Sequence, residues 1–303
     1  MRGSLVSVII PTCGRVDYIG QAIESALNQT AGEVEVVVVD DGATDGSAER
    51  AEKFPGVRVL RQGARTGVSV ARNRALGVAR GEFVVFLDDD DRLLPGAFEV
   101  GLRALAPRPG VALTFGRARI IDHEGRERGV SEAMSAASFA DVLRGAYPVH
   151  PAVAMLRREA VLAVGGFDVW RGIAQDYEFY TRLARRFAVH SHDELVSEYR
   201  KHEGNVFRIR GPAACLEAVL TVVERLRPTL RDDDEVRAWE EARRRWQRLF
   251  GPALPWEVIA QARAGDFGRT RTALGATLRH APMGSLVRFG VDTVRGATRR
   301  RAA

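Results

Sequence analysis

Cysteine is scarce in this chain of 303 residues, and its scarcity excludes two common kinds of site. Cys13 and Cys215 are the only cysteines and lie far apart, so neither a disulfide framework nor a thiolate metal site is indicated. No apolar run is long enough to span a bilayer. The segment 1–10 lacks the apolar stretch and cleavage site of a signal peptide, and we expect it to form a first strand. These absences predict a cytoplasmic protein.

Lysine is almost absent as well, since Lys53 and Lys201 are the only lysines and arginine supplies the other basic residues. The formal net charge is +6, and the region 231–303, with 15 Arg and 9 acidic residues, carries the whole excess. Basic residues and aromatics do not alternate, so nucleic acid is not an expected partner. The contents of 46% hydrophobic and 28% charged residues are typical of a soluble globular protein with one large or two modest domains.

Between residues 5 and 106 the sequence alternates between strand and helix patterns. We expect strands at 6–10, 34–39, 57–60 and 83–87, and helices at 17–29, 44–53, 69–79 and 95–105, with Asp17 as an N-cap. Such alternation predicts an α/β fold with a mostly parallel sheet flanked by helices, which binds ligands beyond the carboxyl ends of its strands. Polar clusters at 11–15, 40–42 and 88–91 fall at such ends.

The pattern changes twice after residue 106. Strand patterns at 111–121, 149–156 and 195–200, a short helix from Arg158 and a helix at 176–187 predict a mixed second half. We therefore expect a domain over 1–210 in two halves, 1–106 and 107–210, of which the second is suited to shaping a pocket for a second substrate. From Pro212 the sequence is almost wholly helical, which predicts a helical C-terminal extension over 211–303.

Four consecutive carboxylates, Asp88 to Asp91, follow the apolar strand at 83–87. They repel one another unless a positive charge joins them, and hard divalent cations prefer oxygen ligands. A site of that kind holds a phosphate-bearing substrate and neutralises charge on its leaving group. The alternative is a solvated acidic turn at a strand end.

Several motifs resemble those of the family 2 glycosyltransferases, which have a GT-A fold. The matching segments are Val6-Ser7-Val8-Ile9-Ile10-Pro11-Thr12, Val38-Val39-Asp40-Asp41-Gly42, Gly67-Val68-Ser69-Val70-Ala71-Arg72-Asn73, Gly81 to Asp91, Gly165-Gly166-Phe167-Asp168, Gln175-Asp176 and Tyr199-Arg200-Lys201-His202. They follow one another in the family's order, over about residues 5 to 205. The resemblance implies that 1–106 is the nucleotide-sugar-binding half of the domain and 107–210 the acceptor-binding half.

For the acidic tetrad, the resemblance implies that Asp90 binds the metal and that Asp88 and Asp89 lie beside the ribose and the metal. In an extended segment, Asp88 and Asp90 would share one face, and Asp89 and Asp91 the other. Asp91 could equally cap the next helix. The resemblance also places His202 at a position that contacts the metal or the diphosphate; the alternative is a surface or packing histidine.

For the nucleotide sugar, the resemblance implies that Asp41 faces the base and that Arg72 binds the donor. Asp40 is expected to serve the turn. Pro11 and Thr12 end the first strand, where backbone and hydroxyl can approach the nucleotide. Arg15 and Arg72 carry guanidinium groups suited to phosphate or a base edge, and for Arg15 a plain surface role stays open.

For catalysis, Asp176 matches the family's catalytic base, which takes a proton from the acceptor hydroxyl. Gln175 stands where the family usually has an acidic residue, which puts the acceptor contacts in doubt. A helix-capping role for Asp176 stays open, and Glu178 is the alternative base. His150 near Pro148 is expected on the acceptor side, with no role assigned.

The resemblance thus implies an inverting glycosyltransferase that uses Mn²⁺ or Mg²⁺, a nucleoside-diphosphate sugar and an unidentified glycan, lipid-linked or small-molecule acceptor. The alternatives are a sugar-phosphate nucleotidyltransferase, which would normally show a glycine-rich basic loop after its first strand, and a non-catalytic nucleotide-sugar-binding protein. The basic tail, with apolar residues between 286 and 294, either lies on the inner face of an anionic membrane or packs on the catalytic domain.

Overall fold

The computed structural model describes residues 3–169, 173–205 and 209–280, which form two compact units. One unit comprises 1–142, 146–171 and 175–202, and the other 143–145, 172–174 and 203–303. The tail at 286–301 lies outside the described residues, so its predicted membrane contact is not addressed by the fold. The division of the first unit into a donor half and an acceptor half stays a prediction.

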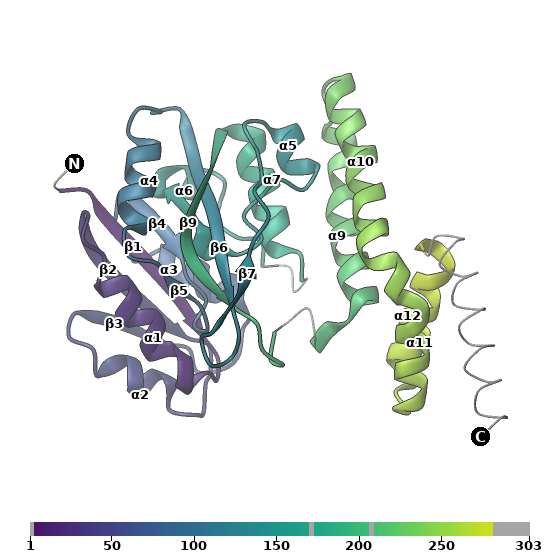
Figure 1. Ribbon diagram of the computed structural model, residues 1–303, viewed down its shortest axis with the longest axis horizontal. Helices are drawn as coiled ribbons and strands as arrows, with labels where there is room; N and C mark the ends of the chain where they lie inside the picture. The colour runs from purple at the N-terminus through teal and green to yellow at the C-terminus, as the bar shows by residue number, and fades with distance from the viewer. Residues whose placement is uncertain (1–2, 170–172, 206–208, 281–303) are drawn as a thin grey trace. The chain divides into compact units, whose positions relative to one another are not determined.

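The first unit is built on one nine-stranded sheet in the order β3-β2-β1-β4-β8-β6-β9-β5, with β7 paired to β6 (Figure 1). Its strands are β1 (Leu5–Thr12), β2 (Glu33–Asp40), β3 (Val57–Arg61), β4 (Phe83–Phe86), β5 (Arg92–Leu93), β6 (Val111–Ile121), β7 (Glu127–Val130), β8 (Ala154–Arg157) and β9 (Ala188–Arg200). The pairs β3–β2, β2–β1 and β1–β4 are parallel, whereas β8 is antiparallel to both of its neighbours. The predicted change from a parallel half to a mixed half therefore occurs.

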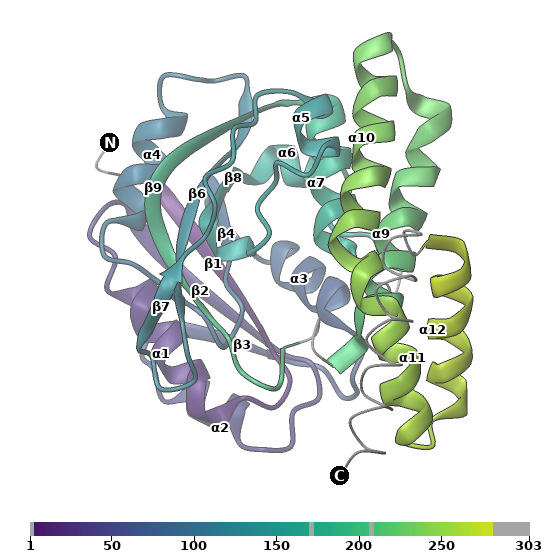
Figure 2. The same ribbon diagram turned by 45° about the vertical axis from the view of Figure 1, so that its right-hand side comes forward.

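Helices cover both faces of this sheet, which explains why its central strands β1, β2 and β4 are largely apolar on both faces. The helices are α1 (Val16–Leu27), α2 (Ser47–Glu52), α3 (Val68–Leu76), α4 (Ala97–Leu105), α5 (Phe139–Leu143), α6 (Arg158–Ala163) and α7 (Gln175–Arg186). Helices α1, α2 and α4 lie on one side of the sheet, and α3, α6 and α7 on the other (Figures 1 and 2). The carboxyl ends of β1, β2 and β4 consequently meet at one edge.

Some sequence predictions for the elements were wrong at the ends. Helix α1 has Arg15, not Asp17, at its N-cap position, and Asp17 lies in the first turn. The strand expected from residue 149 begins only at Ala154, because a 3₁₀ turn at Pro151–Val153 precedes β8. The short strands β5 and β7 were not predicted.

The second unit contains α9 (Pro212–Leu226), α10 (Asp233–Phe250), α11 (Leu254–Arg263) and α12 (Phe267–His280), as the helical pattern predicts. Helix α9 packs its apolar face against α10, where Trp239 donates its indole N–H to the Val223 carbonyl at 2.9 Å. Breaks fall at the expected positions near Pro228, Gly251 and Gly265. Among the described helices, none combines the length and the apolar character that crossing a bilayer requires.

Candidate active site

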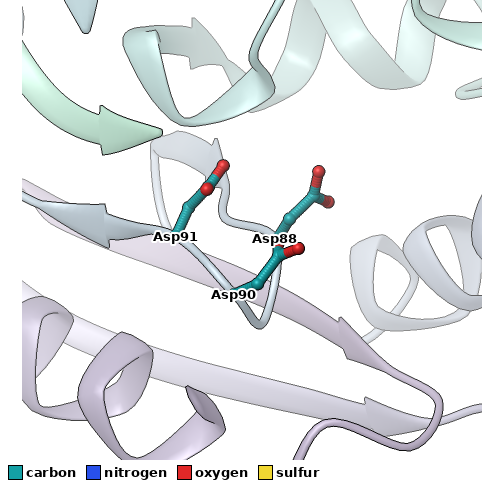
Figure 3. Close-up of side chains that lie close together, drawn as sticks. All are labelled: Asp88, Asp90 and Asp91. Carbon is teal, nitrogen blue, oxygen red and sulfur yellow. The ribbon is translucent and has the colours of Figure 1, made fainter. Parts of the chain in front are cut away.

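The acidic tetrad lies in a turn rather than in a strand. Strand β4 ends at Phe86, and the Asp91 N–H donates to the Asp88 carbonyl at 3.0 Å. In this turn Asp88, Asp90 and Asp91 come together, each with one carboxylate oxygen within 4.8 Å of the others (Figure 3). The predicted alternation, which put Asp91 and Asp89 on the opposite face, is therefore wrong because it assumed an extended backbone.

Asp91 belongs to this cluster and does not cap the next helix. Its Oδ1 accepts the Arg200 backbone N–H at 2.9 Å, and α4 begins after Gly96 without a side-chain cap. Burial raises the pKa of Asp91 well above its usual value, and the neighbouring Asp90 and Asp88 raise it further. Three carboxyl groups are therefore crowded together where burial and mutual repulsion disfavour their charged forms unless a cation joins them.

The cluster of Asp88, Asp90 and Asp91 fits a hard divalent cation. All of its donors are carboxylate oxygens, which Mg²⁺ and Mn²⁺ prefer. Asp90 and Asp91 are buried, and Asp88 is half-buried. Within the described ranges, no other three Asp, Glu, His or Cys side chains gather as closely.

Two cationic or basic side chains approach the cluster at Asp90. His202, just beyond the end of β9, has Nε2 at 2.8 Å from Asp90 Oδ2, so the structure brings the two predicted metal residues together. Arg15 Nη1 lies 2.8 Å from both Asp89 Oδ1 and Asp90 Oδ2. Arg15 therefore contacts the tetrad directly, which argues against a plain surface role.

Asp89 points toward the end of β1 instead of joining the cluster of three. Burial raises its pKa to about 6, although Arg15 lowers it and Asp90 raises it. The Thr12 hydroxyl also lowers this pKa through a hydrogen bond to the Asp89 carboxyl group, although the contact falls outside ideal hydrogen-bond geometry. Pro11 and Thr12 are the last residues of β1 and are buried at the same edge. Asp89 and Thr12 therefore lie together at the end of β1.

Arg72 connects the predicted base to the acidic cluster. Its side chain, on α3, is buried, with Nη1 at 2.6 Å from Asp176 Oδ1 and Nη2 at 2.8 Å from Asp88 Oδ1. Its guanidinium carbon also lies 5.0 Å from the centre of the Phe167 ring. Both Nη atoms thus pair with carboxylates of the protein itself. The sequence prediction, that Arg72 binds the donor, did not include these two ion pairs.

Asp176 is the second residue of α7, so it lies inside the helix and not at the cap position. Burial raises the pKa of Asp176, partly offset by Arg72, while Asp88 raises it further. Its side chain stays 22% exposed, which leaves it accessible to a substrate hydroxyl. Glu178, the alternative base, is held by Arg182 through contacts of 2.7 and 2.8 Å. Asp176 is therefore the better placed of the two carboxylates.

The two acidic residues at the end of β2, Asp40 and Asp41, have different hydrogen-bond partners. Asp40 Oδ1 accepts the Ala43 N–H at 2.7 Å and stabilises the turn, as expected. Asp41 is buried and accepts hydrogen bonds from the loop before α3, at 2.6 Å from the Thr66 N–H and 2.8 Å from the Gly67 N–H. Its carboxylate therefore fixes this loop, and within the described residues it makes no hydrogen bond to the acidic tetrad.

Sequence reasoning missed Arg200 as a structural part of this site. Its backbone N–H binds Asp91, its Nε donates to the Asp90 carbonyl at 2.9 Å, and its Nη2 donates to Gln21 Oε1 at 2.9 Å. Arg200 therefore fixes the tetrad turn from β9. The motif from Tyr199 to His202 indicated that this segment belongs to the site, but it does not indicate which of its residues fixes the tetrad turn.

Comparisons with known proteins agree with this geometry. Residues 7–190 match the family model described as glycosyl transferase family 2. The chain is 34% identical over 210 residues to an uncharacterised protein, MT1568, of Mycobacterium tuberculosis, covering 61% of this chain and 63% of the relative. It is 38% identical over 128 residues to chondroitin synthase of Escherichia coli, covering 41% of this chain and 18% of the relative. The chain thus spans less than two thirds of these relatives.

Two solved structures share the fold. TarS of S. aureus in complex with UDP-GlcNAc is 20% identical, with a TM-score of 0.62 and 93% of each chain covered. The mannosyltransferase PcManGT of Pyrobaculum calidifontis, in complex with GDP-Man and Mn²⁺, is 18% identical, with a TM-score of 0.63, covering 98% of this chain and 81% of the other. The α/β fold with helical extension is thus the predicted GT-A fold. By its matched family model, this chain belongs to glycosyl transferase family 2.

Proposed function

We propose that this chain is an inverting, metal-dependent glycosyltransferase that takes a nucleoside-diphosphate sugar as donor. One observation carries the proposal: Arg72 contacts Asp176 with one nitrogen and Asp88 of the cation-fitting cluster with another. In this proposal Asp176 is the proton acceptor and the cluster binds the diphosphate, so that the two functions lie on two sides of one buried guanidinium group. One-step displacement with inversion needs these two functions beside each other.

We assign the metal to Asp90 and His202, with Asp88 and Asp91 completing the oxygen ligands. Support comes from the 2.8 Å contact between His202 and Asp90 and from the convergence of the three carboxylates. When bound, Mn²⁺ or Mg²⁺ supplies neutralisation of the diphosphate leaving group. The binding of Mn²⁺ and GDP-Man by PcManGT agrees with this assignment.

We assign the nucleotide sugar to the edge formed by β1, β2 and β4. Its proposed contacts are Pro11, Thr12, Arg15, Asp41, Arg72, Asp88 and Asp89. The position of the Thr12 hydroxyl, beside Asp89 at the end of β1, supports a contact there. Arg15 can exchange its contact with Asp90 for one with phosphate, because guanidinium groups pair well with both. For Arg72, the two carboxylate contacts favour positioning of Asp176 in addition to any donor contact.

Asp176 acts as the general base in this proposal. It accepts the proton of the acceptor hydroxyl as the acceptor oxygen bonds to the anomeric carbon and the bond to the diphosphate breaks. Arg72 orients the carboxylate and keeps it ionised, since an adjacent cation favours the charged form. The acceptor is a glycan, a lipid-linked saccharide or a small molecule.

The proposal includes a cytoplasmic location with peripheral contact to the inner face of a membrane. Residues 267–303 contain eight Arg and one acidic residue. Helix α12 exposes Phe267, Leu274 and Leu278 at helical spacing, with exposed fractions of 82%, 47% and 78%. Apolar and cationic side chains on one helix suit an anionic lipid surface. Cosedimentation with phosphatidylglycerol but not phosphatidylcholine vesicles, lost in Phe267→Ser/Leu278→Ser, is the expected result.

Incubation with a panel of UDP-, dTDP- and GDP-sugars, with and without Mn²⁺, tests the enzymatic proposal. We expect metal-dependent release of nucleoside diphosphate, strongly reduced in Asp176→Asn and unchanged in the exposed control Asp17→Asn. Release of pyrophosphate from a nucleoside triphosphate would instead establish a nucleotidyltransferase. Binding of nucleotide sugar without any turnover would establish a non-catalytic binding protein.

A further inference from the structure

His150 lies beside the active site and has no role in the proposal above. It immediately precedes the 3₁₀ turn at Pro151–Val153, and its ring stacks on Tyr199 with centroids 3.5 Å apart and an interplanar angle of 19°. Tyr199 is followed in β9 by Arg200, whose backbone N–H binds Asp91. The imidazole is thus held against Tyr199, the neighbour in sequence of the residue that binds Asp91.

The same loop also contacts the helix that carries the base. Tyr147 lies with its ring 5.1 Å from that of Tyr177 and 6.1 Å from that of Tyr180, both on α7. Asp176 directly precedes Tyr177 in this helix. The segment from Tyr147 to His150 therefore extends from the helix of the base to the strand beside the cation cluster.

The polar atoms of His150 are available for a ligand. Among the described residues, neither ring nitrogen has a hydrogen-bond partner, and the side chain is only half-buried. Burial lowers the pKa of His150 to about 4, although Asp88 raises it, so the ring is neutral at pH 7. A neutral imidazole offers one N–H donor and one nitrogen acceptor, which matches the hydrogen bonding of a sugar hydroxyl.

We propose that His150 hydrogen-bonds a carbohydrate hydroxyl between Asp176 and the acidic cluster, and so selects the substrate. The hydroxyl belongs either to the transferred sugar or to the acceptor, since both meet at this place in the proposed reaction. The inference rests on the proposed glycosyltransferase function. It makes His150 a specificity residue, with Tyr199 as the surface that orients its ring.

The test compares His150→Phe, which keeps an aromatic ring against Tyr199, with His150→Gln, which keeps a hydrogen-bonding group. His123→Gln, at an exposed histidine, is the matched control. Three quantities are measured for each variant: hydrolysis of the donor in water without acceptor, transfer to an acceptor, and binding of UDP or GDP with Mn²⁺. Melting temperatures show whether each variant is folded.

A neutral hydrogen bond contributes about 0.5–1.5 kcal/mol, so we expect His150→Phe to lower kcat/KM by about twofold to twelvefold. His150→Gln is expected to retain more activity than His150→Phe, and His123→Gln to match the wild type. A higher donor KM in both hydrolysis and transfer assigns the hydroxyl to the transferred sugar. A higher acceptor KM with unchanged hydrolysis assigns it to the acceptor.

Unchanged kinetics in folded His150→Phe would overturn the inference. Equal losses in both variants together with weaker binding of nucleoside diphosphate would also overturn it, because a damaged cation site would then explain the loss. If either variant does not fold, the other still carries the comparison of KM values. A wild-type protein that turns over no nucleotide sugar would remove the proposed function itself, and the inference with it, before any variant is compared.

Discussion

Two ion pairs, one from each unit of the chain, differ in how far they are exposed to solvent. In the first unit, Arg72 is buried and its ion-pair partner Asp176 is 22% exposed. In the second, Arg144 and Asp234 also pair at 2.6 Å, but their side chains are 29% and 52% exposed. Buried charges lose their hydration and are costly to keep, whereas exposed pairs cost and contribute little. The costly buried pair of Arg72 and Asp176 is the one to which the proposed function assigns a role.

Replacement of Asp176, the proposed base, is expected to have the largest effect of the changes considered for the two units. In Asp176→Asn, no carboxylate is left to take the acceptor proton, and we expect kcat to fall by about 10²–10⁴-fold. Release of nucleoside diphosphate from the donor measures the effect. A variant that keeps more than half of the wild-type rate would show that Asp176 serves only the structure of α7, and Asp17→Asn controls for charge removal alone.

Replacement of Arg72 tests the buried pairs by stability. Arg72→Met leaves Asp176 and Asp88 without their cation, and breaking a buried pair in this way costs about 3–5 kcal/mol. Urea unfolding at pH 7 measures the free energy of unfolding. Arg72→Lys keeps the charge but not the two-pronged geometry, so an intermediate loss is expected. Equal stability of Arg72→Met and wild type would contradict the proposed coupling of the two carboxylates.

Metal binding to the cluster of Asp88, Asp90 and Asp91 is expected to stabilise the first unit. With Mn²⁺ and UDP or GDP at about a hundred times their dissociation constant, binding adds about 2.7 kcal/mol to the stability of the folded state. We therefore expect a rise in the melting temperature that EDTA abolishes and that Asp90→Asn lacks. A rise of the same size in Asp90→Asn would place the metal elsewhere.

The pH dependence refines the contrast between buried and exposed carboxylates. Burial raises the pKa of Asp176 above the usual value for Asp, and a general base must be deprotonated to act. Activity should therefore increase with pH through this raised pKa, so the acid limb of kcat/KM lies above pH ~3.9. Because Arg72 lowers the pKa of Asp176, the limb should shift to higher pH in Arg72→Lys if that contact weakens. A limb at the ordinary Asp value would contradict the burial effect.

The smallest effect is expected in the second unit. Asp234→Asn removes one partner of Arg144 on an exposed surface, where screening by water leaves such pairs little effect on stability. Glu241 remains as a second partner at 2.8 Å, so we expect no resolvable change in the free energy of unfolding. Urea unfolding again provides the measurement, and a loss as large as that of Arg72→Met would abolish the contrast between the units.

The sequence predicted where the site would lie but not how its side chains contact one another. The strands that end at Thr12, Asp40 and Phe86 were expected to end within two residues of these positions, because β-branched and apolar runs give way there to polar residues. The contacts of Arg72 with Asp176 join residues 104 positions apart, and no local pattern encodes such a distance. The tetrad turn was missed because its geometry depends on Arg200, far along the chain.

The most direct test of the central claim is an NMR time course of an α-linked nucleotide sugar with the protein, Mn²⁺ and an acceptor. We expect release of nucleoside diphosphate together with a β-linked product, neither of which forms when EDTA is added or when Asp176→Asn replaces the wild type. An α-linked product, or an unchanged rate in the variant, would contradict one-step displacement by Asp176 beside the acidic cluster.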